Sequence, residues 1–143
     1  MELVEIILTS ALPARIEHLP ALVEAVRSAA ISSGLSRREI LRMELAADEA
    51  LLNAINYAYG GKEGEVEIVC RADHEVFSLE IMDRGSPFDP LSVKEPDVTA
   101  DVEERRIGGL GIHLIRTLVD TVDYRREAGK NVLTLSLSKK VEG

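Results

Sequence analysis

The chain has 143 residues, of which 45% are hydrophobic and 29% are charged, as is typical of one globular domain with a single core. Its formal net charge of −8 argues against direct binding to nucleic acid, which depends on clustered basic residues. No apolar run approaches the ~20 residues that span a bilayer, and the amino-terminal residues lack the basic region of a signal peptide. We therefore expect a cytoplasmic protein without membrane contacts that forms one domain over residues 1–143.

The first predicted elements are a strand and a helix. Residues 2–9 are rich in Leu, Val and Ile and predict a strand. Pro13 suits the first turn of a helix that continues to about residue 33. Pro20 lies inside this helical pattern and predicts either a kink or a later helix start. Gly34 is well placed to end the helix.

The second predicted helix contains the most informative segment, ELAADEALLNAINYAY, residues 44–59. Ser36 and Glu39 form a capping-box pattern that opens this helix. On a helical wheel, its narrow polar stripe is bordered by apolar residues on both sides, which favours a helix that lines a cleft. The alternative is an ordinary amphipathic helix with a solvated polar face. The stripe contains Arg38, Arg42, Glu49, Asn53 and Asn56; the borders contain Leu41, Leu45 and Leu52 on one side and Met43, Ala46, Ala50 and Ala54 on the other.

Within this stripe, Glu49 and Asn53 are four residues apart, so both side chains project from one face of the helix. A carboxylate can take a proton from a hydroxyl group or from water. A neutral amide oxygen is a hard ligand that suits Mg²⁺. The pair is therefore a candidate for proton transfer beside a bound cation.

Two strand-like runs follow, residues 65–72 and 76–83, joined by a turn near Asp73. The single cysteine, Cys70, cannot form an intramolecular disulfide and is predicted to be a small buried hydrophobic residue. No cluster of Cys and His in the sequence has the spacing of a structural zinc site.

The second of these runs has an apolar face that ends in a carboxylate, because Asp83 shares the period-two face of Phe77, Leu79 and Ile81. A carboxylate at the edge of a core needs hydrogen-bond donors, and the exocyclic amino group of adenine is a suitable one. Gly85 would allow a sharp turn and the close approach of a flat ring. The alternative is that Asp83 simply initiates a turn.

Residues 85–107 are rich in Pro, Asp, Glu and Ser and show no period; a loop of this length inside a domain is usually functional. Glycines 108, 109 and 111 then precede an apolar helix that reaches residue 120. Free N–H groups and the positive end of the helix dipole make this a natural phosphate site, although it matches neither a P-loop nor a dinucleotide fingerprint. His113 on this helix is predicted to be partly exposed and not a catalyst.

The last predicted elements are strands at residues 121–127 and 131–138, separated by a turn. The order strand, helix, helix, two strands, loop, helix, two strands favours an α+β fold. We expect a two-layer sandwich in which a mostly antiparallel mixed sheet is covered on one face by helices.

Together, ELAADEALLNAINYAY, DRGSPFDP and GGLGIHLI resemble the N, G1 and G2 boxes of the GHKL (histidine-kinase-like) ATP-binding superfamily, and most closely its small anti-sigma-factor serine/threonine-protein kinases. The resemblance covers essentially the whole chain and implies the cofactors ATP and Mg²⁺, with residues 85–107 as the ATP lid. It also implies that Glu49 is the general base for a serine of a partner protein and that Asn53 binds Mg²⁺. Asp83 would bind adenine N6 in a pocket shaped by Gly85. The phosphates would be bound by the backbone N–H groups of Gly109, Leu110, Gly111 and Ile112.

The chain departs from the family pattern at two places. Tyr57 stands where the N box commonly has His. Asn131-Val132 stands where relatives often have Gly-Thr-Thr, whose second Thr reaches the adenine site. The corresponding hydrogen bond is therefore expected to be absent or to come from Thr134.

By the same resemblance, we expect a kinase that acts as an anti-sigma factor: it would bind a sigma factor, phosphorylate an anti-anti-sigma protein of the STAS type and form a homodimer. The first long helix is the natural place for a partner surface. One alternative is an ATP-binding regulatory module that holds a partner without transferring phosphate. Another is the catalytic fragment of a histidine kinase, which is disfavoured because no phosphoacceptor helix hairpin precedes the first strand.

Overall fold

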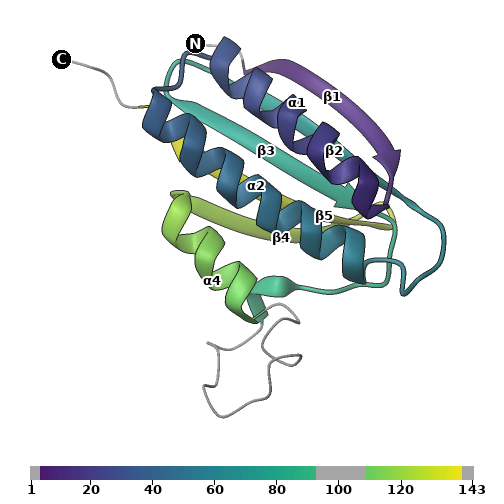
Figure 1. The fold of residues 1–143 in the computed structure, drawn as a ribbon. Coiled ribbons are helices and arrows are strands. Elements are labelled where there is room, and N and C mark those ends of the chain that lie inside the picture. The colour runs from purple at the N-terminus through teal and green to yellow at the C-terminus, as the bar shows by residue number, and fades with distance from the viewer. Residues whose placement is uncertain (1–3, 93–108, 140–143) are drawn as a thin grey trace.

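In a computed structural model, the described residues are 4–92 and 109–139. They form a two-layer α+β sandwich in which the helices lie on one face of a single sheet, as Figure 1 shows. This arrangement confirms the predicted fold class. The strands are β1 (Glu5–Pro13), β2 (Glu65–Ala72), β3 (Val76–Asp83), β4 (Thr121–Glu127) and β5 (Lys130–Ser138); the helices are α1 (Leu19–Ser32), α2 (Arg37–Tyr57), α4 (Gly109–Leu118) and the short 3-10 helices Ile16–His18 and Pro90–Ser92.

The sheet has the strand order β1-β2-β3-β5-β4. All four pairings of the described strands are antiparallel, so the sheet lacks the parallel pair that a mixed sheet would have. Because β3 pairs with β5, Asp83 at the end of one strand lies opposite Asn131 near the start of the other. This register brings two segments that are distant in sequence to the same edge of the molecule.

The amino-terminal elements differ from the prediction in their boundaries. β1 extends to Pro13, which pairs with Glu65 instead of starting a helix. Proline is tolerated there because β1 is an edge strand, where a missing N–H group costs little. α1 starts only at Leu19, with Pro20 in its first turn, so the later start was the correct alternative. Gly34 follows the helix with a φ of 84°, as its predicted role requires.

The capping box predicted for α2 is confirmed. Ser36 Oγ accepts a hydrogen bond from the Glu39 N–H group at 3.2 Å, and Glu39 Oε1 accepts one from the Ser36 N–H group at 2.7 Å. These bonds satisfy two donors that the helix itself leaves free. After the helix, Gly60 and Gly61 adopt positive φ angles and turn the chain toward β2.

The core lies between the helices and the inner face of the sheet, where Phe77, Leu79 and Ile81 are buried. Cys70 is buried with them, as predicted, and desolvation raises the pKa of its thiol to about 12. On the face of the sheet without helices, Glu80 forms ion pairs with Arg71 and, at 3.0 Å, with Arg125. No helix in the described part of the chain is both long and apolar enough to cross a membrane.

Candidate active site

A cavity of about 410 Å³ lies between the carboxyl-terminal half of α2, the adjoining ends of β3 and β5, and α4. Its size is that of a small-molecule site, and its lining follows the usual pattern of an apolar wall with a few polar groups. The polar groups include the side chains of Asn53, Asp83, Tyr124 and Asn131. The apolar wall includes Ala50, Ala54, Ile81, Ile112, Ile115 and Leu133.

Asp83 lines this cavity and has the donors that its position demands. Its Oδ1 accepts hydrogen bonds from the Gly85 N–H group and from Asn131 Nδ2, both at 2.9 Å. The bond from Gly85 is the turn-initiating contact of the alternative interpretation. Asp83 therefore makes a local turn and also presents a carboxylate to the cavity.

Gly85 is needed at this corner because the backbone at the end of α2 passes close to it. A Cβ atom at this position would lie 1.9 Å from the carbonyl oxygen of Ala58, at the end of α2. Gly85 is absent from the lining of the cavity, and the close approach at this position is made by protein backbone; the predicted approach of a ligand ring stays a prediction. The glycine shapes the pocket indirectly, because it lets the chain after β3 pack against α2.

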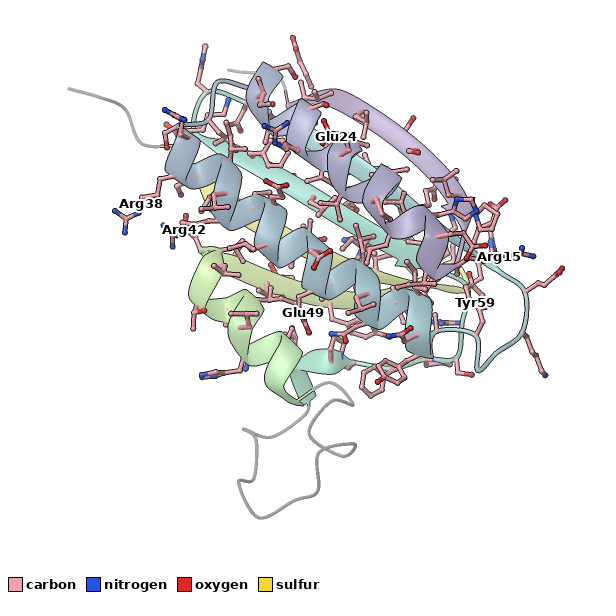
Figure 2. The ribbon with its side chains drawn as sticks, in the orientation of Figure 1. Arg15, Glu24, Arg38, Arg42, Glu49 and Tyr59 are labelled. Carbon is pink, nitrogen blue, oxygen red and sulfur yellow. The ribbon has the colours of Figure 1, made fainter. Side chains whose placement is uncertain are left out.

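Glu49 and Asn53 meet Gly111 where α2 packs against α4. A Cβ atom on Gly111 would lie 2.7 Å from Glu49 Oε1 and 2.7 Å from Asn53 Nδ2. Figure 2 shows Glu49 directed from α2 toward α4. Asn53 lines the cavity, whereas Glu49 lies one helical turn closer to the amino end of α2 and is half-buried. The structure thus brings the predicted pair together with the predicted glycine segment.

The four residues predicted to bind phosphates, 109–112, form the first turn of α4. The first four N–H groups of a helix have no partner within it, and the helix dipole adds positive potential at this end. Ile112 also lines the cavity. His113 is exposed, as predicted. Gly108 and residues 93–107 of the predicted lid lie outside the described residues, so the lid stays a prediction.

The two apolar borders of the α2 stripe have different environments. Met43 and Ala46 on one border are buried in the core, as expected for a helix that lines a cleft. Leu41 and Leu45 on the other border are 53% and 47% exposed. The helix therefore has buried apolar residues on one side of the stripe and exposed leucines on the other, since no element of the described chain covers Leu41 and Leu45.

Several residues that line the cavity were not predicted as site residues, among them Tyr57, Tyr124 and Asn131. Two of them, Tyr57 and Asn131, had been noted only as departures from the family pattern. The alternative that Thr134 replaces the missing threonine is wrong, because Thr134 alternates with Leu133 of the cavity wall and is absent from the cavity lining. A signal for Asn131 did exist: it begins the inner face that Leu133, Leu135 and Leu137 continue, just as Asp83 ends the inner face of β3.

Comparisons with known proteins agree with this geometry. Residues 12–137 match the histidine kinase-like ATPase domain. The chain belongs to this family. This histidine kinase-like ATPase is 31% identical over 131 residues to the serine-protein kinase RsbW of Listeria monocytogenes, covering 88% of this chain and 83% of that protein. It is also 31% identical over 102 residues to the serine/threonine-protein kinase BtrW of Bordetella bronchiseptica, covering 71% of this chain and 72% of the relative.

A solved structure of the RsbU and RsbW domains of a Mycobacterium tuberculosis protein superposes with a TM-score of 0.62 at 16% identity. The match covers 94% of this chain and 33% of that longer chain, and it supports the fold. The sequence relatives, which are named as protein serine or serine/threonine kinases, place this ATPase among the protein serine/threonine kinases. ATP is accordingly the ligand expected in the cavity.

Proposed function

We propose that this kinase transfers the γ-phosphoryl group of ATP to a serine hydroxyl of a partner protein, with Glu49 as the general base. The observation that carries the proposal is the meeting of Glu49, Asn53 and Gly111 beside the cavity. At this point a carboxylate, an amide and the positive end of α4 converge. Phosphoryl transfer depends mainly on positioning and charge stabilisation, and these groups supply both.

The two ends of the site suit the two ends of ATP. Asp83 and the apolar wall fit the adenine, since a carboxylate can accept a hydrogen bond from the 6-amino group. The first turn of α4 fits the phosphates, because its free N–H groups and its dipole favour anions. Glu49 is adjacent to that turn, so its carboxylate can take the proton of a serine hydroxyl that attacks the γ-phosphorus.

We also propose that Mg²⁺ is bound with the nucleotide. No group of three or more His, Cys, Asp or Glu side chains that could hold a metal occurs in the described ranges, so these residues offer no complete cage. A site with few protein ligands fits Mg²⁺, which usually takes one or two protein ligands and completes its coordination shell with phosphates and water. Asn53 would be the protein ligand, and the ion would neutralise charge on the transferred group.

The surface next to Glu49 is suited to a protein substrate. Leu41 and Leu45 are exposed along α2, and Figure 2 shows Arg38 and Arg42 projecting from the same half of this helix. We propose that the substrate is an anti-anti-sigma protein of the STAS type and that the kinase binds a sigma factor when the substrate is absent. We further propose a homodimer, which light scattering at several concentrations would test.

The decisive experiment is incubation with labelled ATP, Mg²⁺ and candidate STAS proteins. The Glu49→Gln variant should lose phosphoryl transfer and should retain ATP binding in calorimetry, because the amide cannot accept the proton. Asp48→Asn is the matched control, since it neutralises the neighbouring exposed carboxylate of α2. Undiminished transfer by Glu49→Gln would remove Glu49 from its assigned role. Tight ATP binding by the wild type without transfer to any partner would instead favour a regulatory module.

A further inference from the structure

Asn131 is a buried polar residue in the wall of the cavity, with 8% of its surface exposed. All four hydrogen-bonding positions of its amide are used. Nδ2 donates to Asp83 Oδ1 and to the Ser86 carbonyl oxygen, both at 2.9 Å. Oδ1 accepts from the Tyr124 hydroxyl at 2.6 Å and from the Phe88 N–H group at 3.3 Å.

These partners allow only one orientation of the amide. A carboxylate and a carbonyl oxygen can only accept, so they require the NH₂ group of Asn131 on their side. The backbone N–H group of Phe88 can only donate, so it requires the amide oxygen on the other side. Tyr124 must then donate its hydroxyl proton to the same oxygen. The amide cannot flip without placing like groups against each other.

The fixed amide in turn fixes the carboxylate of Asp83. Oδ1 receives both the Asn131 bond and the Gly85 bond, whereas no hydrogen bond within the described chain reaches Oδ2. Asp83 lines the cavity, and its Oδ1 is occupied by protein hydrogen bonds while its Oδ2 remains available to accept a hydrogen bond from a ligand. A free carboxylate oxygen attracts a 6-amino group and repels a 6-oxo group of a purine.

We infer that Asn131, oriented by Tyr124, is a positioning residue that selects adenine over 6-oxo purines by holding Asp83 with a single acceptor free for the ligand. This inference rests on the proposed role of Asp83 in binding the adenine. The network also connects the purine end of the cavity to the chain at residues 86–88. Within it, Asn131 of β5 lies 43 to 48 residues beyond its partners Phe88, Ser86 and Asp83 in the sequence.

The test compares the dissociation constants of ATP and inosine triphosphate, which carries a 6-oxo group, by calorimetry without protein substrate. The wild type should prefer ATP. Asn131→Ala should narrow that preference by about tenfold, the effect of losing a hydrogen bond to a charged group, with little change in the affinity for inosine triphosphate. Tyr124→Phe removes only a hydroxyl group and should narrow the preference in the same direction by less.

Thr134→Val is the matched control, because Thr134 lies on the same strand, is absent from the cavity lining and has a buried hydroxyl without a partner. It should leave the preference unchanged. Equal weakening of both nucleotides by Asn131→Ala and Tyr124→Phe would show a merely structural role and overturn the inference. An Asp83→Asn variant distinguishes failure of the proposed role of Asp83 from failure of the inference about Asn131. If Asp83→Asn keeps the wild-type preference for ATP over inosine triphosphate, the proposed role of Asp83 fails. If Asp83→Asn loses that preference but Asn131→Ala keeps it in full, only the inference about Asn131 is overturned.

Discussion

Replacing Gly111 with alanine should damage catalysis while leaving the fold intact. The added Cβ atom would lie 2.7 Å from Glu49 Oε1 and from Asn53 Nδ2. Ordinary van der Waals contact begins at 3.4 Å, so these two groups must each retreat by about 0.7 Å. Both are the far ends of flexible side chains, which can move at little energetic cost. The displaced groups, however, are those proposed to take the proton and to hold the cation.

The magnitude follows from this displacement. A misplacement of about 1 Å in a catalytic constellation can cost about 100-fold in rate, so we expect kcat to fall by roughly 30- to 100-fold. The free energy of unfolding should instead rise slightly, because alanine is favoured over glycine in a helix by up to about 1 kcal/mol. The signature is a kinase that melts no earlier than the wild type and transfers phosphate far more slowly.

The assay is steady-state phosphorylation of a STAS substrate at saturating ATP, combined with thermal unfolding of the same preparations. Thr117→Ala is the control, since it alters an exposed position of the same helix. Wild-type kcat in Gly111→Ala would refute the argument that the contact of α4 with Glu49 and Asn53 is part of the catalytic geometry. A large loss of stability would refute the argument that the side chains yield before the backbone.

Three further predictions concern the fold. Ser36→Ala removes one half of the capping box and should lower the free energy of unfolding by about 1 kcal/mol in urea titrations, whereas Ser28→Ala at an exposed position of α1 should have little effect. Cys70 should react with iodoacetamide at pH 8 only when the protein unfolds. Its pKa is raised to about 12 in the fold, so above about pH 9 the thiol loses its proton more readily in the unfolded chain and the free energy of unfolding should fall as the pH rises. Cys70→Ala should remove this pH dependence. Asp73 accepts two backbone N–H bonds that hold its pKa below the usual value. Its stabilising effect should therefore be complete at neutral pH and decline below about pH 4. Asp73→Asn should unfold at a lower urea concentration than the wild type at pH 7, and this difference from the wild type should disappear in acid.

Local signals predicted most of the fold. The capping box of Ser36, the period of β2 and β3 and the position of Gly34 each depend on neighbours in the sequence, and the structure confirms them. The boundary of β1 could not be predicted in this way. Pro13 is compatible with a helix start and with an edge strand, and only the pairing of β1 with β2 decides between them.

The site was predictable only where the chemistry could be recognised from a motif. Glu49, Asn53, Asp83 and the turn at residues 109–112 were expected; Asn53, Asp83 and Ile112 line one cavity, and Glu49 meets Gly111 beside it. Asn131 was missed because its importance comes from the antiparallel register that sets it opposite Asp83. The exposure of the outer leucines of α2 was also missed, since a helical wheel shows that a side is apolar but not whether another element covers it.

The pairing of β3 with β5 also has a thermodynamic consequence. Asp83 and Asn131 are 48 residues apart in the chain, and Asn53 and α4 lie on still other segments, so a denatured chain holds nothing that imitates the nucleotide cavity. ATP should therefore bind the native state alone and shift the unfolding equilibrium by mass action, by about 2.7 kcal/mol at a concentration 100-fold above its Kd. The melting temperature would thus report occupancy in variants that have lost all turnover.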